Sequence, residues 1–212
     1  MPAELGLRER KKAQTRRQIF DAANQLFRKR GFDSVTVAEI AQAADVSEVT
    51  VFNYFPTKEA LFYGGMQFFE EQLIDAVHSR ARGESALSAF RSRLLEGADR
   101  LAAKETVDSI KKAAQAISAS PSLVARERDI VDRYTRQLAA VLAEATGASP
   151  DDAEPLATAG ALMAVHRVLV EHARKEVLAG RRGPQLVEDY RSQARRAFRR
   201  LERGLGDYAV KS

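Results

Sequence analysis

The chain has 212 residues, of which 45% are hydrophobic and 30% charged; its net charge is +5 and it contains no cysteine. These values are typical of a folded globular protein, and they exclude disulfides, thiol catalysis and cysteine-bound metal sites. No run of about 18 apolar residues and no apolar signal-peptide core occurs, so we expect a cytoplasmic protein with no membrane partner.

The first predicted helix ends at the basic turn 28–30. Apolar residues recur at spacings of three and four from Ile19 to Phe27, which indicates one buried stripe. Gly31 follows the basic turn, as is typical of a helix C-terminus.

Two short helices are predicted next. Thr36 and Glu39 have the spacing of a capping box, in which the hydroxyl and the carboxylate each bind an amide at the start of a helix. A turn at Asp45 leads to Ser47, which caps a third helix ending near Tyr54. Three helices with a four-residue turn before the third describe a helix-turn-helix.

The rest of the sequence also has helical periodicity. Thr57 is the predicted cap of a helix from Lys58, and we expect helical segments over the following approximate ranges: 60–81, 85–103 continuing to 118, 121–144, 150–179 and 184–205. The predicted fold is therefore all-α, with about nine helices. A helix-turn-helix head with a basic N-terminal arm covers residues 1–56, and a larger helical body covers residues 57–212.

One pattern runs through the head in register. Its residues are Leu26, Phe27, Gly31, Phe32, Thr36, Val37, Ile40, Ala41, Val46, Ser47, Thr50, Val51, Phe52, Tyr54, Phe55, Lys58, Glu59 and Leu61. Over roughly residues 12–62 this pattern resembles the DNA-binding head of the TetR family of bacterial transcriptional regulators. Asp45 and Val49 stand where that family often has glycine, and Phe52 where it often has tyrosine; these departures concern base preference.

The resemblance implies that the third helix enters the major groove of double-stranded DNA. Glu48, Val49 and Asn53 are then the candidates to contact bases: cytosine N4, a thymine methyl and adenine, respectively. Glu48 is also explained as an acid at a helix N-terminus, and Val49 as a residue without a DNA role. Donors suited to phosphate are found at Arg16, Arg17, Thr36, Ser47, Thr50, Tyr54 and Lys58.

Other side chains of the head are assigned to packing, to helix capping or to electrostatic attraction toward DNA. Capping is the expected main role of Thr36 and Ser47. Phe52 and Phe55 are expected in the core. The basic residues of 8–12 are expected to form a disordered arm, which either enters a minor groove or only strengthens attraction to DNA.

The resemblance also implies a homodimer and a small-molecule effector. The dimerisation candidates are Leu156, Gly160, Ala164, Leu186, Tyr190, Ala197, Phe198 and Leu201. The effector-binding candidates are Phe62, Met66, Phe69, Phe90, Leu94, Ile117, Tyr134, Met163, His166 and Arg167. Packing within the core of one chain is the alternative for both sets.

The charges are unevenly distributed. Residues 1–30 carry a net charge of +6, residues 181–212 carry +5, and the segment between them carries −6. Basic ends favour a nucleic-acid partner or are solvated termini, and an acidic body favours a cationic effector or is a solvated surface. The adjacent acids Glu70–Glu71 and Asp151–Asp152 are expected to be solvated.

The sequence has no nucleotide-binding, hydrolase or metal-ligand motif, so we expect no enzyme, no cofactor and no metal site. The combined interpretation is a ligand-responsive transcriptional regulator, most simply a repressor. It binds an inverted-repeat operator as a homodimer and is released by an unknown effector. The alternative is an architectural or effector-independent DNA-binding protein with the same head.

Overall fold

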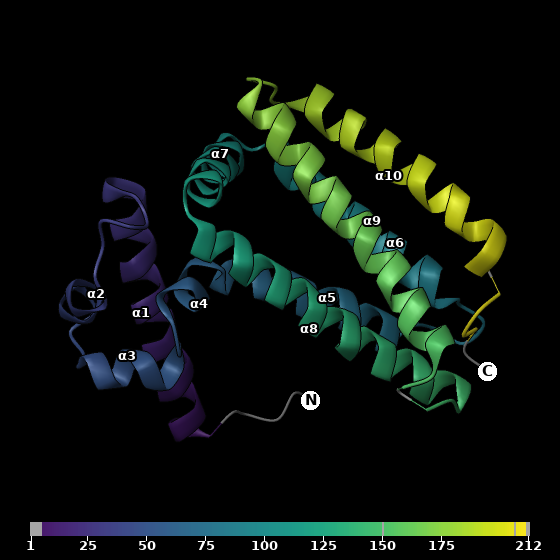
Figure 1. Cartoon of the computed structure of the whole chain (residues 1–212), viewed down its shortest axis with the longest axis horizontal. Coiled ribbons are helices and arrows are strands. Elements are labelled where there is room, and N and C mark those ends of the chain that lie inside the picture. The colour runs from purple at the N-terminus through teal and green to yellow at the C-terminus, as the bar shows by residue number, and fades with distance from the viewer. Residues whose placement is uncertain (1–5, 150, 206, 211–212) are drawn as a thin grey trace. The chain divides into compact units, whose positions relative to one another are not determined.

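A computed structural model describes residues 6–149, 151–205 and 207–210, with the backbone alone at residues 7–9 and 65–68. In this part of the chain all regular structure is helical, comprising ten α-helices and one 3₁₀ helix (Figure 1). The all-α prediction is therefore confirmed. None of the described helices is long and apolar enough to span a membrane. The chain forms two compact units, Met1–Gln67 and Phe68–Ser212.

The first unit contains the helix-turn-helix. Its helices are α1 (Leu7–Arg30), α2 (Val37–Ala43), α3 (Glu48–Tyr54) and α4 (Lys58–Phe62). Its core is built from side chains with no more than 1% exposure, which include Ile19, Val35, Ile40, Val51 and Leu61. The core holds together three helices that are each too short to be stable alone.

The predicted caps of the head are formed. The amide of Glu39 donates to Thr36 Oγ1 (3.2 Å), and the amide of Thr36 donates to Glu39 Oε2 (2.8 Å), which completes the capping box. Ser47 caps α3 by accepting from the Thr50 amide (3.1 Å). Asp45 has φ 52°, the left-handed geometry that aspartate tolerates better than most residues.

The second unit is built around α9. Its elements are the main part of α5 (Gly64–His78), followed by α6 (Ala86–Glu96), the 3₁₀ helix η1 (Gly97–Ala102), α7 (Lys104–Ala119), α8 (Pro121–Thr146), α9 (Ala153–Leu178) and α10 (Pro184–Leu205). Helix α9 packs against α6, α7, α8 and α10. Figure 1 shows α8 and α9 as long helices joined by a turn, with α10 lying along α9.

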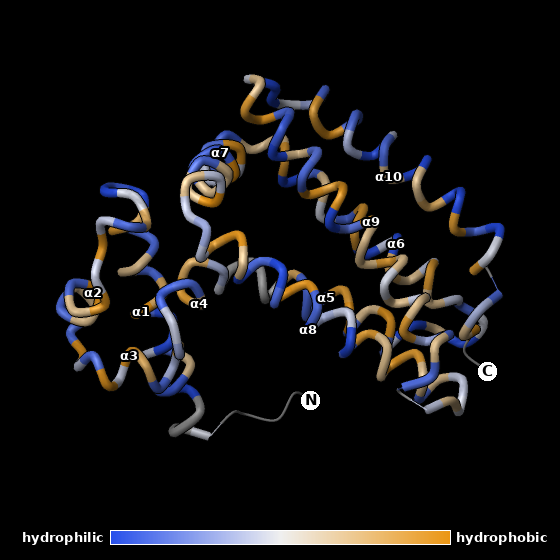
Figure 2. The backbone as a smooth tube through the Cα atoms, in the orientation of Figure 1, coloured by the Kyte–Doolittle hydropathy of each residue, from blue (hydrophilic) through white to orange (hydrophobic). Residues whose placement is uncertain are grey.

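Helix α10 is strongly amphipathic. It buries Leu186, Tyr190 and Phe198, and the Phe198 ring lies 6.3 Å from that of Phe90 on α6. Figure 2 shows hydrophilic and apolar segments alternating along this helix. At its edge, Arg191 pairs with Asp99 of η1 at 2.9 Å.

Several predicted boundaries differ from the structure. The prediction of a single helix over 60–81 is wrong, because α4 ends at Phe62 and α5 begins at Gly64. A Cβ at Gly64 would lie 2.9 Å from the ring of Phe20, so this glycine permits a close approach. The continuous segment 85–118 is interrupted by η1, which ends at Ala102.

Two predictions about helix starts also need correction. Helix α1 already begins at Leu7, so residues 8–12 are helical rather than a disordered arm; they are rich in good helix formers. Helix α9 begins at Ala153, after Asp152, whose carboxylate accepts from the Ser149 amide at 2.9 Å. The expected start at residue 150 lies outside the described residues.

A buried arginine just after α5 ties the C-terminal segment to the rest of the second unit. Arg80 is 5% exposed, and its guanidinium donates to the carbonyl oxygens of Val77, Glu84 (3.2 Å) and Ala209 (2.7 Å). Three carbonyls from two distant parts of the chain therefore depend on one side chain.

Replacing Arg80 with methionine leaves these carbonyls without their charged donor. We expect the free energy of unfolding of the second unit to fall by about 3 kcal/mol or more, measured by urea denaturation. The control is Arg82→Met at a neighbouring exposed position, which should change it by less than about 0.5 kcal/mol. Equal stability of the two variants would contradict the assigned role.

Candidate nucleic-acid interface

One face of α3 is turned to solvent although part of it is apolar. Val49 is 69% exposed and Phe52 is 47% exposed, and Asn53 is also exposed. Spacings of three and four residues place these side chains on one face of the helix. The opposite side carries Val51, which is fully buried, and Phe55, which is 4% exposed.

The expectation that Phe52 packs in the core is therefore wrong. Val51 and Phe55 lie four residues apart and occupy the inward face, so the helical rotation at position 52 turns the aromatic ring outward. The expectation for Phe55 is confirmed. The signal that could have found the exposed Phe52 is its spacing of three from Val49.

Three of the four candidate hydroxyl donors, Thr36, Ser47 and Thr50, are at the start of helices. The Ser47 and Thr50 hydroxyl oxygens are 2.8 Å apart and hydrogen-bonded, and both lie at the first turn of α3. Thr36 Oγ1 donates to Glu39 Oε2 at 3.0 Å, within the capping box. Glu48 is exposed in the first turn of α3, and Tyr54 is half-buried at its end.

The candidate cations have different surroundings. Arg17 is 84% exposed and lies 3.7 Å from Asp21, and Arg16 lies over the ring of Phe55 at 5.4 Å. Both guanidinium groups are on the exposed side of α1.

Lys58 is held much more closely by its own chain. Its Nζ donates to the carbonyl oxygens of Phe32 and Val35, both at 3.1 Å, and lies 4.3 Å from the centre of the Phe32 ring. An ammonium group has three N–H donors, so one remains for another acceptor. Lys58 therefore holds the loop between α1 and α2 in addition to any contact with phosphate.

An ion pair also joins α1 to α2. Arg30 donates to Glu39 Oε1 and to the Ser34 carbonyl oxygen, each at 2.6 Å. The backbone hydrogen bond from Thr36, followed by the bond from Arg30, lowers the pKa of Glu39 to about 2. Because this pKa is below the ordinary value, the stability that Glu39 contributes is fully present at pH values above the pKa of an unfolded glutamate. It is lost as the pH falls toward 2.

The effector candidates are distributed over both units. Phe62 belongs to the first unit, where its ring lies 6.1 Å from that of Phe27 and 5.5 Å from that of Phe32. The Met66 side chain lies outside the described residues. Buried candidates in the second unit are Phe90, Leu94, Ile117, Tyr134, Met163 and His166. Phe69 is half-buried and Arg167 is exposed.

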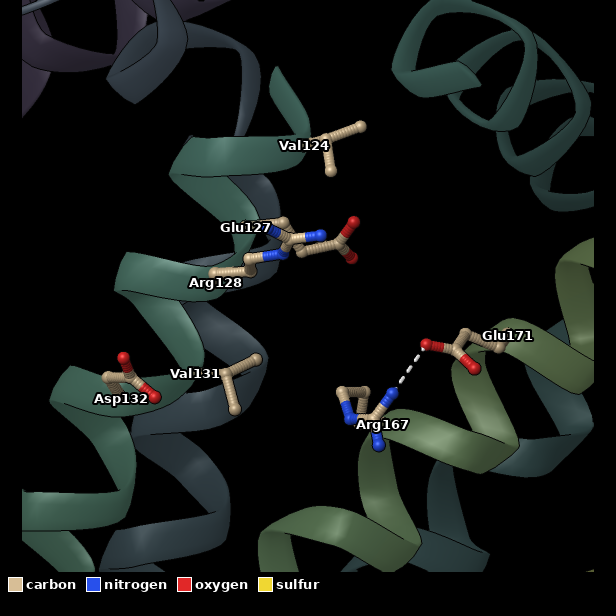
Figure 3. Close-up of a pocket in the computed structure, with 7 residues that line it drawn as sticks. All are labelled: Val124, Glu127, Arg128, Val131, Asp132, Arg167 and Glu171. Atoms are coloured by element: carbon tan, nitrogen blue, oxygen red, sulfur yellow. Dashed lines mark hydrogen bonds and ion pairs between the residues drawn. The ribbon is translucent and has the colours of Figure 1, made fainter. Parts of the chain in front are cut away.

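A groove of about 390 Å³ lies between α8 and α9. It is lined by Val124, Glu127, Arg128, Val131, Asp132, Arg167 and Glu171. Figure 3 shows Val124, Glu127 and Val131 projecting from α8 toward α9, where Arg167 binds Glu171 at 2.8 Å. Arg167 is the effector candidate that lines this groove.

Polar side chains lie unexpectedly deep in the second unit. Glu70 is 4% exposed, so the expectation that this acid is solvated is wrong; Glu71 is exposed as expected. The signal in the sequence is that Leu73 and Val77, both fully buried, follow Glu70 on the same helical stripe. His166 is 5% exposed, and burial, followed by the charge of Arg174, lowers its pKa to about 4.

The dimerisation candidates separate into two groups. Leu156 and Ala164 are exposed on α9, and Gly160 is half-buried there. On α10, Leu186, Tyr190 and Phe198 are buried within the single chain, and Ala197 and Leu201 are half-buried.

Comparisons with known proteins match both units. The family model described as bacterial regulatory proteins, tetR family, matches residues 19–63, and that of the MftR C-terminal domain matches residues 84–206. The HTH-type transcriptional regulator TcmR of Streptomyces glaucescens is 30% identical over 151 residues, which cover 69% of this chain and 67% of TcmR.

The fold is also found among solved structures. A SmeT–triclosan complex aligns with a TM-score of 0.58 at 17% identity, covering 92% of this chain and 94% of SmeT. A TetR transcriptional regulator from Rhodococcus sp. RHA1 aligns with a TM-score of 0.54 at 22% identity, covering 91% of this chain and 98% of that protein. With the two family models spanning the head and most of the body, the chain belongs to the TetR family of bacterial transcriptional regulators.

Proposed function

We propose that this protein is a cytoplasmic, homodimeric repressor that binds an inverted-repeat operator and is released by a small-molecule effector. The observation that carries the proposal is the outward face of α3, where Val49, Phe52 and Asn53 are exposed on a helix held by a hydroxyl cap and a buried valine. An exposed apolar face on such a helix favours contact with the major groove.

The side chains of this face suit particular bases. Val49 and Phe52 offer apolar surface to thymine methyl groups, and the Asn53 amide can pair with adenine N6 and N7. The hydroxyls at Thr36, Ser47, Thr50 and Tyr54, with Arg16, Arg17 and Lys58, are proposed to bind phosphate. Glu48 remains a candidate for cytosine N4.

A dimer is supported by the outward face of α9. Three large apolar side chains of this helix are exposed, namely Leu156 (43%), Val168 (53%) and Leu178 (48%). Gly160 and Ala164 lie along the same helix and permit close approach of a partner helix. We propose that this face is the main contact and that the half-buried Ala197 and Leu201 support it from α10, whereas Leu186, Tyr190 and Phe198 pack α10 onto its own chain.

Two-fold symmetry then determines the operator. A dimer presents two copies of α3 to two half-sites about 34–36 Å apart, or a multiple of this distance, and the half-sites form an inverted repeat. The effector would bind in the second unit. SmeT has the same fold, and its solved complex contains triclosan, which supports small-molecule binding in such a body.

The proposal is tested by selecting bound sequences from a random double-stranded DNA pool at about 150 mM salt, a concentration at which phosphate contacts alone bind weakly. We expect an inverted repeat. Recovery of no motif, with binding that disappears as salt increases, would favour the effector-independent architectural protein instead.

The apolar face of α3 gives a second prediction. Replacing a contacted thymine of the selected half-site with uracil removes one methyl group, so we expect affinity to fall by about fourfold at that position. In the variants Val49→Ala and Phe52→Ala, thymine and uracil should bind equally at the position that the lost side chain contacts. Thymines outside the half-sites are the control, and an unchanged thymine preference in both variants would contradict the assignment.

Lys58 gives a third prediction, because it is engaged within the head. In Lys58→Met the free energy of unfolding of the head should fall by about 1.5–3 kcal/mol, since two carbonyls lose a charged donor. The slope of log affinity against log salt should also become shallower by about 1 if the third N–H binds phosphate. Lys29→Met, at an exposed position, is the matched control for stability; equal stability of both variants would be contrary to expectation.

A further inference from the structure

The outer side of α10 carries a row of arginines. All of them are exposed, and together we call them the arginine face: Arg195, Arg196, Arg199, Arg200 and Arg203. With about 3.6 residues per turn, they fall within an arc of about 140° of the helix, opposite the stripe that buries the apolar side chains of α10. The excess of positive charge at the C-terminal end of the sequence is therefore gathered on one surface.

The charged side chains at the edges of α10 are engaged within the chain. Arg191 pairs with Asp99 of η1 at 2.9 Å. Glu202, the one acid between residues 190 and 205, lies outside the arc of the arginine face and pairs with Arg91 of α6 at 2.5 Å. These ion pairs hold α10 to its neighbours and leave the charge of the arginine face uncompensated.

The first two arginines of the face have only weak partners. Arg195 lies 3.4 Å from Glu188, and both side chains are more than half exposed. An ion pair as exposed as this one contributes little. Arg196 donates to Gln193 Oε1 at 2.7 Å, and a neutral amide does not compensate its charge.

Helix stability does not explain this arrangement. Within the part of the chain that the structure describes, the guanidinium groups of Arg199, Arg200 and Arg203 form no hydrogen bond or ion pair. Residues three and four apart on a helix are neighbours, so the arginines form like-charge pairs that oppose the helix. The helix dipole favours cations in the last turn and accounts for Arg203 alone. A row of uncompensated cations on a helix that they weaken indicates an anionic partner.

The chemistry and spacing of the arginine face suit a row of phosphates. A guanidinium group presents its N–H donors in a plane and binds phosphate in a bidentate manner. Arg195, Arg199 and Arg203 recur every four residues, which separates them by about 6 Å along the helix axis. Each strand of duplex DNA carries a phosphate about every 3.4 Å along its axis. Regularly spaced cations therefore face regularly spaced anions.

Two other partners fit this face less well. In a symmetric contact between two copies of the chain, arginine would lie opposite arginine. An amphipathic helix binds a membrane by burying its apolar side in the lipid. The apolar side of α10, with Leu186, Tyr190 and Phe198, is covered by its own chain instead. Double-stranded DNA is also the partner already proposed for α3.

We propose that the arginine face of α10 binds the phosphate backbone of double-stranded DNA, independently of base sequence and separately from α3. The second unit then has a DNA contact of its own, in addition to the proposed dimer and effector sites. The inference goes beyond the proposed function, because it requires neither an operator nor an effector.

The first test removes charge from the arginine face. The full chain with Arg199→Gln, Arg200→Gln and Arg203→Gln should bind a duplex without the operator more weakly than the unchanged chain does. Each lost phosphate contact makes the slope of log affinity against log salt shallower by about 0.9, so we expect a total change of about 2–3. Fluorescence anisotropy of a labelled duplex over a range of salt concentrations measures the slope.

The matched control removes the same charge from other exposed positions. Lys111→Gln, Lys112→Gln and Arg136→Gln lie on α7 and α8 and should keep the slope of the unchanged chain. Glutamine is about as good a helix former as lysine or arginine, so both triple variants should fold, which circular dichroism checks. Equal slopes in the two triple variants overturn the proposal.

Crosslinking tests for a direct contact. The chain has no cysteine, so Ser192→Cys places a single thiol on the same arc of α10, about one turn before the arginine face. Labelled with a thiol-specific aryl azide, this variant should crosslink to the duplex on illumination. Ala140→Cys, at an exposed position of α8, is the control. No more product from Ser192→Cys than from Ala140→Cys overturns the proposal.

An anionic membrane is compared with DNA as the competing partner. The unchanged chain and the arginine triple variant are sedimented with vesicles of phosphatidylserine and phosphatidylcholine at the salt concentration used for DNA. We expect the loss of the three arginines to reduce DNA binding more than vesicle binding. The reverse order would assign the arginine face to a membrane surface and overturn the proposal.

Selection of bound sequences separates this inference from the proposed function. The arginine triple variant leaves α3 intact, so it should select the same inverted repeat as the unchanged chain. If an inverted repeat is selected but the two triple variants have equal slopes, the repressor stands and the arginine face has no DNA role. If no motif is selected but the arginine variant has the shallower slope, the DNA contact of α10 stands and the repressor function fails.

Discussion

The ammonium group of Lys58 holds the helix-turn-helix at its least regular point. It binds two carbonyl oxygens of the loop between α1 and α2 and lies against the Phe32 ring. Helices α2, α3 and α4 have seven, seven and five residues, so none is stable by itself. The outward face of α3 is presented reproducibly only because caps, the buried Val51 and this lysine fix the short helices together.

The sequence predicts the features that have local causes, most of them in the head. Hydroxyl caps at Thr36, Ser47 and Thr57, the αL aspartate in the turn and the glycine after α8 depend on a few neighbouring residues, and each is found where expected. The need for a glycine at position 64 depends instead on the Phe20 ring, far away in the sequence. The sequence therefore contains this glycine but not the reason for it.

The burial of individual side chains is harder to predict from the sequence than the helix caps are. Phe52 is an aromatic residue, and hydrophobicity alone favours the core, but Val51 and Phe55 already occupy the inward face. Glu70 is an acid next to another acid, which favours solvent, but it continues a stripe that contains Leu73 and Val77. In both cases helical position prevails over residue type.

The hydroxyl pair at the start of α3 has a consequence for how the helix meets other molecules. Ser47 and Thr50 carry two hydroxyl hydrogens, and their mutual hydrogen bond at 2.8 Å uses one of them. Because either oxygen can be the donor in that bond, the remaining hydrogen belongs to Ser47 in one arrangement and to Thr50 in the other. The exposed end of α3 can thus shift its outward donor by one helical turn through a reorientation of two hydrogens, without moving a heavy atom.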